Sequence, residues 1–104
     1  MADLSPTQFA EQIKAIGTQI LDVRTPAEFA EGHLANAINI DFYSESFDQH
    51  LSQLDKNKNY ALYCRSGQRS GMAAEQMKQM GFSNVCNLSG GILDWIATGL
   101  AIIK

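Results

Sequence analysis

The sequence predicts a single α/β domain in which a parallel sheet is covered by helices on both faces. Its 104 residues can bury one hydrophobic core without disulfides or metals. Short apolar runs alternate along the chain with segments whose apolar residues follow helical spacing, a pattern typical of a parallel sheet. No repeat, low-complexity tract or linker interrupts this alternation. We therefore expect residues 1–104 to form one domain.

The first two helices are predicted by the same N-terminal signature. At Ser5 and again at Thr25, a hydroxyl residue precedes a proline and is followed three residues later by glutamine or glutamate. Apolar residues at helical spacing follow Ser5, and Gly17 ends that helix. A strand is predicted over residues 19–23, and the second helix ends near Gly32.

The rest of the chain continues the alternation. We predict, in turn, a strand over 37–40, a helix over 44–54, a strand over 59–63, a helix ending at Gly81, a strand over 84–88 and a helix over 91–98. Met72, Met77 and Met80 lie in the helix before Gly81, and we assign all three to the core.

Polar and reactive residues gather at the predicted strand ends. Asp22, Arg24 and Cys64 all lie where a predicted strand finishes. In parallel sheets the carboxyl ends of the strands meet at one edge, and binding sites form there. We therefore expect these residues to contribute to one site.

The segment around Cys64 is depleted in negative charge. The 19 residues between Asp55 and Glu75 contain no carboxylate, although the chain carries a net charge of −3, and they include Arg65 and Arg69. A strand, a glycine-containing loop and a helix N-terminus can point backbone N–H groups at one anion. A thiol placed there ionises easily, and the thiolate is the reactive form. Cys64 is therefore predicted to be a nucleophile in an anion site.

The second cysteine has a different setting. Cys86 lies on a predicted strand without nearby cations, so we assign it to core packing, and a resolving thiol for Cys64 is the alternative. We expect both thiols to be free. Two cysteines and the distant His33 and His50 make a poor metal site, so no metal is predicted.

Composition excludes several classes of function. The acidic balance and the absence of a basic stripe give no reason to expect nucleic acid as a partner. No apolar run approaches the roughly 20 residues needed to cross a bilayer. The N-terminus lacks the basic and apolar regions of a signal peptide, which favours a cytoplasmic protein, although a mature chain given a new start methionine would look the same.

Three segments resemble the signatures of the single-domain rhodanese family of sulfurtransferases. Residues 21–40, with Leu-Asp-Val-Arg and later Gly-His-Leu, resemble the first signature. Residues 64–69, Cys-Arg-Ser-Gly-Gln-Arg, resemble the active-site loop, and residues 87–95, with Gly-Gly-Ile-Leu-Asp-Trp, resemble the C-terminal signature. They occur in the family's order.

This resemblance implies both a fold and a reaction. The fold is a three-layer α/β/α domain with a five-stranded parallel sheet. The Cys64 thiolate takes a sulfane sulfur from a donor such as thiosulfate, becomes a persulfide and passes the sulfur to a small acceptor such as cyanide or a thiol, without a cofactor. Arg65 and Arg69 would attract an anionic donor. The terminal sulfur or donor anion would be held by the backbone N–H groups of Arg65, Ser66, Gly67, Gln68, Arg69 and Ser70.

Four further residues are assigned supporting roles. Asp22 either orients an arginine or forms a structural ion pair. Arg24, Glu28 and His33 are expected to form a local hydrogen-bond network that holds the first signature in place. Glu28 also departs from the two-domain thiosulfate enzymes, which carry arginine there, and this argues against efficient thiosulfate binding. Asn36 stands where the family commonly has glycine, and asparagine tolerates the left-handed backbone that such a turn needs.

Two alternative functions remain open. Phosphatases and arsenate reductases of a related fold have five residues between cysteine and arginine, whereas only four separate Cys64 from Arg69. The shorter loop favours a single sulfur atom over a tetrahedral phosphate. The second alternative is a persulfide carrier or regulatory binding module that receives sulfur from a partner protein in a sulfur relay.

Overall fold

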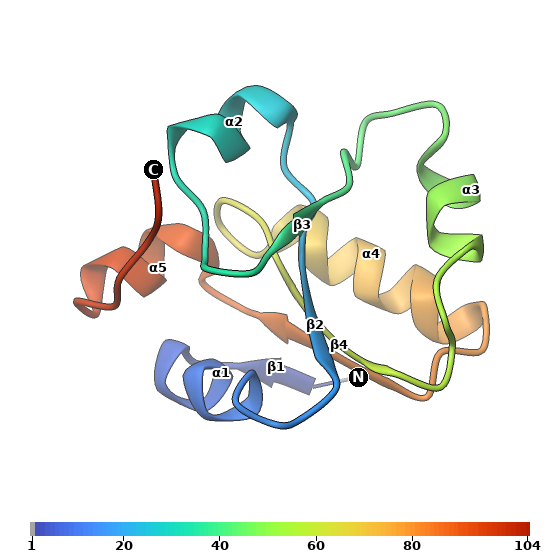
Figure 1. Ribbon diagram of the computed structural model, residues 1–104, viewed down its shortest axis with the longest axis horizontal. Coiled ribbons are helices and arrows are strands. Elements are labelled where there is room, and N and C mark those ends of the chain that lie inside the picture. Colours follow the sequence, from blue (N-terminus) through green and yellow to red (C-terminus); the bar gives the residue numbers. More distant parts are fainter. Residues whose placement is uncertain (1) are drawn as a thin grey trace.

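The sheet of this chain has five parallel strands, as the computed structural model of residues 2–104 shows (Figure 1). The strands lie in the order β1-β5-β4-β2-β3. Their bounds are β1 Ala2–Leu4, β2 Thr18–Asp22, β3 Ile38–Asn39, β4 Asn59–Tyr63 and β5 Asn84–Leu88. The helices are α1 Pro6–Gln12, α2 Pro26–Glu31, α3 Phe47–Ser52, α4 Gln68–Gln79 and α5 Gly91–Ala97. The predicted fold class is confirmed.

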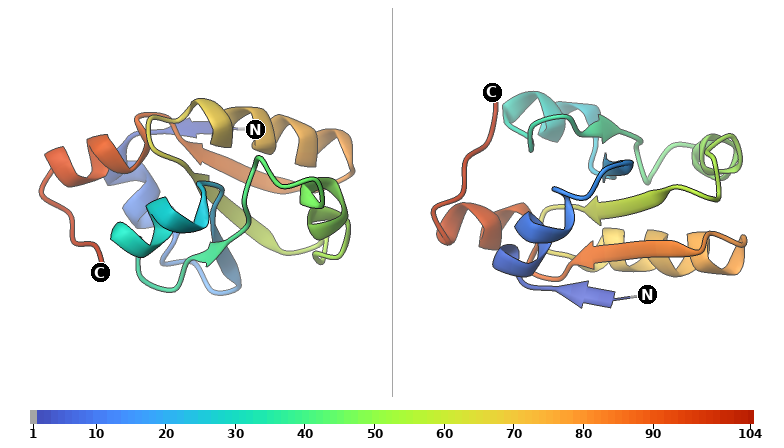
Figure 2. Two further views of the ribbon diagram at one scale, coloured as in Figure 1. Left: turned by 90° about the horizontal axis from the view of Figure 1, so that it is seen from above. Right: turned by 60° about the horizontal axis from the view of Figure 1, so that its bottom comes forward.

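Two hydrophobic cores lie on opposite faces of the sheet. Successive residues of a strand point to opposite faces, so Leu62 packs with α3 and α4, whereas its neighbour Tyr63 packs with α1 and α5. Figure 2 shows α1 and α4 on the two sides of the sheet. This arrangement makes three layers. The carboxyl ends of β2 and β4 meet at the edge beneath α2, where Asp22 lies beside Tyr63.

The local signals at the helix ends are mostly confirmed. Both predicted capping boxes are formed, at Ser5 and at Thr25. Gly81 comes directly after Met80, the C-cap residue of α4, and has φ +99° as expected for a glycine at this position. Asn36 has φ +68°, the one positive value among the non-glycine residues of 2–104. Asparagine therefore supports the left-handed turn, as predicted.

Two helices are shorter than predicted. The first ends at Gln12, before the predicted end at Gly17, and the apolar Ile16 is fully exposed in the turn that follows. The helix predicted over 44–54 forms only at Phe47–Ser52. The Ser44 hydroxyl accepts the N–H of Ser46 at 3.1 Å, so this serine stabilises a turn that competes with a helical start.

The alternation of apolar and polar residues does not predict the first strand, β1. Residues 2–4 pair in parallel with β5, placing Asp3 beside Asn87. Three residues are too few for an alternating pattern to be visible, and Ala2 and Asp3 are exposed. The resemblance implied a fifth strand, but periodicity did not locate it.

One core assignment is wrong. Met77 is fully buried, but Met72 is 58% exposed on the outer side of α4. Helical spacing alone cannot separate a core stripe from an apolar residue beside it. No helix within residues 2–104 has the length and apolar character needed to cross a bilayer.

Candidate active site

Cys64 lies directly after β4, at the start of a tight loop that ends where α4 begins. The residue is 1% exposed. Gly67 precedes α4 with φ +96°, and a Cβ atom on it would lie 1.9 Å from the carbonyl oxygen of Ser89. Gly91 is packed as closely against the carbonyl oxygen of Arg65, at 2.2 Å from its would-be Cβ. Only glycine at these two positions lets the loop press against the turn between β5 and α5.

Backbone hydrogen bonds fix this loop against α5. Ile92 donates its N–H to the carbonyl oxygen of Cys64 at 2.9 Å, and Leu93 donates to that of Arg65 at 3.2 Å. The carbonyl groups of Cys64 and Arg65 thus point toward α5. The Gly67 N–H, which follows them in the loop, points to the cysteine sulfur.

Several donors converge on the sulfur of Cys64. The Gly67 N–H lies 3.1 Å from Sγ, and the Ser70 hydroxyl lies 3.3 Å from it. Burial by itself raises the pKa of the thiol, but hydrogen bonds from the Ser70 hydroxyl and from the backbone of Ser70, Gly67 and Ser66 outweigh it. The pKa of Cys64 is therefore lowered, which makes its thiolate easier to form.

The two loop arginines have different partners. Arg69 makes a two-pronged ion pair with Glu28, with Nη1–Oε1 and Nη2–Oε2 distances of 2.8 and 2.9 Å. This pair raises the pKa of Arg69 and lowers the pKa of Glu28 to about 2. Arg65 is exposed, and no carboxylate in the described part of the chain lies within ion-pair distance of it. We expected both arginines to attract an anionic donor, and the structure shows that the Arg69 charge is offset by the carboxylate of Glu28.

Asp22 and Arg24 form a buried ion pair at the end of β2. The guanidinium donates to the carboxylate at 2.6 to 3.0 Å and to the carbonyl oxygen of Gly32 at 2.6 Å. Both side chains are almost completely inaccessible to solvent. Asp22 thus holds Arg24 rather than a loop arginine, and the pair ties the end of α2 to the sheet.

The predicted network of Arg24, Glu28 and His33 does not form. Glu28 belongs to the arginine pair of the loop, and Arg24 to the buried pair. His33 stacks on Phe29 with ring centroids 3.8 Å apart, and a ring nitrogen lies 3.0 Å from the Phe29 carbonyl oxygen. Its backbone forms a bridge with Ile103. His33 therefore fastens the C-terminal segment to the end of α2.

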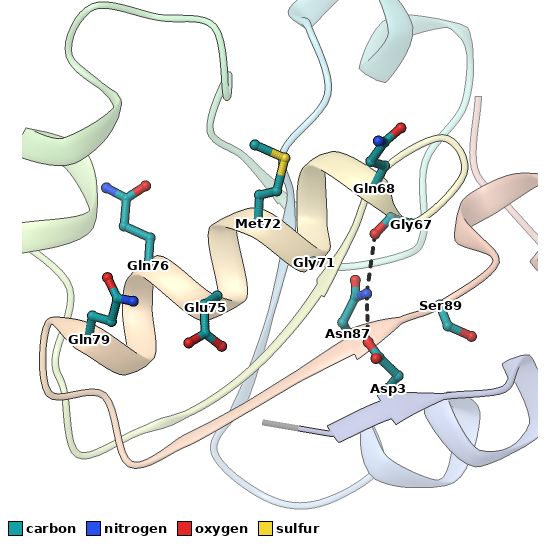
Figure 3. A pocket seen from close by; sticks show the side chains of 10 residues that line it. All are labelled: Asp3, Gly67, Gln68, Gly71, Met72, Glu75, Gln76, Gln79, Asn87 and Ser89. Carbon is teal, nitrogen blue, oxygen red and sulfur yellow. Dashed lines mark hydrogen bonds between the residues drawn. The ribbon is translucent and has the colours of Figure 1, made fainter.

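The sequence does not single out Asn87 and Asp3, which are connected to the sulfur through hydrogen bonds. Asn87, buried in β5, accepts a 2.5 Å hydrogen bond from the Ser70 hydroxyl. Its amide nitrogen donates to Gly67 and to Asp3, as Figure 3 shows. An amide side chain on a buried strand was the available signal. The partner Asp3 comes from the strand that periodicity did not locate.

Two depressions flank the loop. One runs along the outer side of α4 toward β1 and is lined by Gln68, Met72 and Glu75 among others (Figure 3). The other is a cleft of about 210 Å³ between α2 and α5, lined by Glu28 and Arg65 together with the exposed Leu93 and Ile96. Small molecules or a partner surface could approach the loop from this cleft.

The two cysteines are both free, and they face different cores. Cys64 packs with α3 and α4, whereas Cys86 packs on the opposite face with α1 and α5. Burial raises the pKa of Cys86 to about 11. The sheet between them argues against Cys86 as a resolving thiol. No group of three or more metal-ligating side chains occurs among residues 2–104.

Comparison with known proteins points to one family. A family model described as "Rhodanese-like domain" matches residues 5–98. A protein named sulfurtransferase from Allochromatium vinosum is 37% identical over 84 residues, which cover 81% of this chain and 77% of that protein. Thiosulfate sulfurtransferase 16 of Arabidopsis thaliana is 32% identical over 101 residues, covering 88% and 84%.

Solved structures agree with this result. The crystal structure of a rhodanese-related protein from Thermoplasma volcanium has a TM-score of 0.87 and 33% identity, covering 99% of this chain and 98% of that one. Some other relatives are longer, and the chain spans only 58% of the length of a senescence-associated protein of Raphanus sativus and 60% of the length of an uncharacterised Bacillus subtilis protein.

Proposed function

The chain belongs to the rhodanese-like domain family, and from this premise we propose that it is a sulfurtransferase whose carrier is a persulfide on Cys64. The observation that carries the proposal is the convergence of the Gly67 N–H and the Ser70 hydroxyl on a buried cysteine sulfur. Such donors stabilise a thiolate and, after sulfur is gained, a persulfide anion.

In the first half of the cycle the Cys64 thiolate attacks the sulfane sulfur of the donor. A new sulfur–sulfur bond forms at Cys64 while the donor's own sulfur–sulfur bond breaks. With thiosulfate the electron pair leaves on sulfite, and one negative charge remains on the outer persulfide sulfur. The inward N–H groups of the loop are the groups that would hold this charge.

In the second half an acceptor nucleophile attacks the outer sulfur. The bond to Cys64 breaks and its electron pair returns to Cys64 as a thiolate. With cyanide the product is thiocyanate, and with a thiol the product is a new persulfide. The two displacements balance without an oxidant, a reductant or a cofactor.

The ion pair of Glu28 with Arg69 bears on the choice of donor. It cancels one of the two positive charges beside Cys64, so a doubly charged small donor such as thiosulfate is attracted less strongly than the two arginines alone would attract it. This observation favours a second candidate function, a persulfide carrier that receives sulfur from a partner protein. The exposed Leu93 and Ile96 beside Arg65 offer such a partner apolar contact.

Intact-mass measurement tests the proposal. After incubation with thiosulfate or with a cysteine-desulfurase-type donor, we expect a gain of about one sulfur atom that maps to Cys64 and is reversed by cyanide. Cys64→Ser should abolish the gain, and Cys86→Ala should retain it. A gain only with the protein donor would favour the carrier. No gain with either donor, or hydrolysis of an aryl phosphate that depends on Cys64, would overturn sulfur transfer.

A further inference from the structure

The hydroxyl group of Ser70 has one proton and two possible acceptors, the sulfur of Cys64 and the amide oxygen of Asn87. The Ser70 side chain is fully buried, 3.3 Å from the Cys64 sulfur and 2.5 Å from Oδ1 of Asn87. A serine hydroxyl carries one proton and can accept through its lone pairs. It can therefore donate to the sulfur or to the amide oxygen, but not fully to both.

The amide of Asn87 is held in one orientation. Its Nδ2 donates to the Asp3 carboxylate at 3.0 Å and to the Gly67 carbonyl oxygen at 3.3 Å, as Figure 3 shows. Both partners are acceptors only, so the –NH₂ group must face them and Oδ1 must face Ser70. Asn87 can consequently accept from Ser70 but cannot donate to it.

This count of protons links the Ser70 hydroxyl to the charge on the sulfur. While Cys64 carries its proton, the S–H can donate to Ser70, and Ser70 donates to Asn87. When the thiolate forms, it accepts hydrogen bonds but cannot donate one, so a hydrogen bond between Ser70 and the sulfur then requires the Ser70 proton to turn toward the sulfur and leave Asn87. Each state satisfies Ser70, and neither leaves its buried hydroxyl unpaired.

We propose that Asp3, Asn87 and Ser70 form a positioning relay in which Asp3 fixes the Asn87 amide and Asn87 holds the Ser70 proton away from Cys64 until the thiolate forms. The relay rests on the proposed function in one respect, namely that Cys64 is the group that reacts. After sulfur gain the charge moves to the outer sulfur, and the Ser70 proton can return to Asn87. No covalent bond to hydrogen breaks in this rotation.

Other charged groups around the sulfur are accounted for. Arg69 lies near enough for a Cys64 thiolate to raise its pKa, but its guanidinium is paired with Glu28. Arg65 is exposed at the loop. Neither arginine is hydrogen-bonded to Asp3, Asn87 or Ser70. A substitution of Asp3 can therefore change the ionisation of Cys64 in two ways, through the hydrogen bonds of the relay or through the loss of one exposed charge.

The test measures the ionisation of Cys64 through the pH dependence of its alkylation by iodoacetamide, with peptide mapping to separate it from Cys86. In Asp3→Ala the Asn87 amide loses an anchor and can turn its –NH₂ group toward Ser70. The Ser70 proton is then free for the sulfur. We expect the ratio of thiolate to thiol at a fixed pH to rise about fivefold, the worth of one hydrogen bond.

Two control variants separate the effect of the relay from the effect of removing a negative charge. Asp3→Asn removes the charge but keeps an acceptor oxygen, and Glu75→Gln removes another exposed charge from the same depression. Both should stay close to the wild type. If Asp3→Ala matches these two variants, or lowers the thiolate ratio, the relay is wrong.

A double-mutant cycle provides a readout that a merely structural role would not change. In a Ser70→Ala background the effect of Asp3→Ala on ionisation should vanish, because the shared proton is gone. An effect that persists there overturns the relay. These measurements concern the thiol alone, so a chain that fails to transfer sulfur but shows the Asp3→Ala shift would contradict the proposed function and leave the relay standing.

Discussion

The two cysteines of this chain are both buried, yet the protein shifts their pKa values in opposite directions. Cys64 is 1% exposed and Cys86 is 8% exposed. The pKa of Cys64 is lowered, whereas burial raises the pKa of Cys86 to about 11. Burial is therefore not what distinguishes a reactive thiol from an inert one. The difference lies in the hydrogen-bond donors that each sulfur meets.

The position along the strand explains this difference. Cys86 lies in the middle of β5, paired with Ala2 on one side and Ala61 on the other, so the neighbouring backbone N–H groups are committed to the sheet. Cys64 lies one residue beyond β4, where the loop has left the sheet and the Gly67 N–H can turn to the sulfur. A strand end offers donors that a strand interior has already used.

Replacing Gly67 should remove most of the difference in pKa between Cys64 and Cys86. In Gly67→Ala the new Cβ would lie 1.9 Å from the Ser89 carbonyl oxygen, so the loop must move and its N–H groups leave the sulfur. We expect sulfur transfer to fall by about 100-fold or more, as when a donor to a reacting anion is lost. The pKa of Cys64, followed by alkylation, should rise toward that of Cys86.

Gly17→Ala is the matched control for that change. Gly17 also has a positive φ, +84°, but no atom lies within 4 Å of its would-be Cβ. It should lose about 1 kcal/mol of stability through backbone strain and retain sulfur transfer. Equal losses of transfer in the two variants would show that general destabilisation, not the loop donors, sets the reactivity of Cys64.

Cys64 differs from Cys86 in two ways, since it has hydrogen-bond donors at its sulfur and a positive charge nearby. Releasing Arg69 from Glu28 changes the charge and leaves the donors in place. Glu28→Gln leaves the Arg69 charge uncompensated beside the loop. We expect kcat/KM for thiosulfate to rise about five- to tenfold, with a gain that shrinks as salt is added. Glu31→Gln removes an exposed carboxylate from the same cleft and should change this constant less.

The alkylation profile of Glu28→Gln then bears on the cysteine comparison itself. If donors dominate, the ionisation of Cys64 should move far less than in Gly67→Ala. A shift as large as that of Gly67→Ala, in the opposite direction, would mean that charge rather than N–H donors makes Cys64 different from Cys86.

What could be predicted from the sequence is the part of the site that lies within a short segment. The strand, the glycine and the following helix around Cys64 are adjacent in the chain, so local patterns revealed them. The pair of Glu28 and Arg69 joins residues 41 positions apart, and the pair of Asp3 and Asn87 joins residues 84 apart. Such contacts depend on strand order and register, which propensity and periodicity do not determine.

The same limit explains the individual errors. Arg69 carries a charge whatever its surroundings, so the sequence could place a cation at the loop but could not reveal its neutralisation by Glu28. The exposure of Met72 depends on which face of α4 the sheet covers. The family resemblance implied five strands, but only the pairing of β1 with β5 identifies the fifth.

The smallest effect is expected at Cys86, and it completes the comparison. Cys86→Ala removes one buried sulfur from the core shared by α1 and α5, so the free energy of unfolding should fall by about 1 kcal/mol in urea titrations. Persulfide formation at Cys64 and its pH profile should stay unchanged, because the sheet separates the two thiols. A slower release of sulfur in this variant, or a disulfide between the cysteines in the oxidised wild type, would instead give Cys86 a part in the cycle. Burial without donors would then no longer be enough to make a thiol inert.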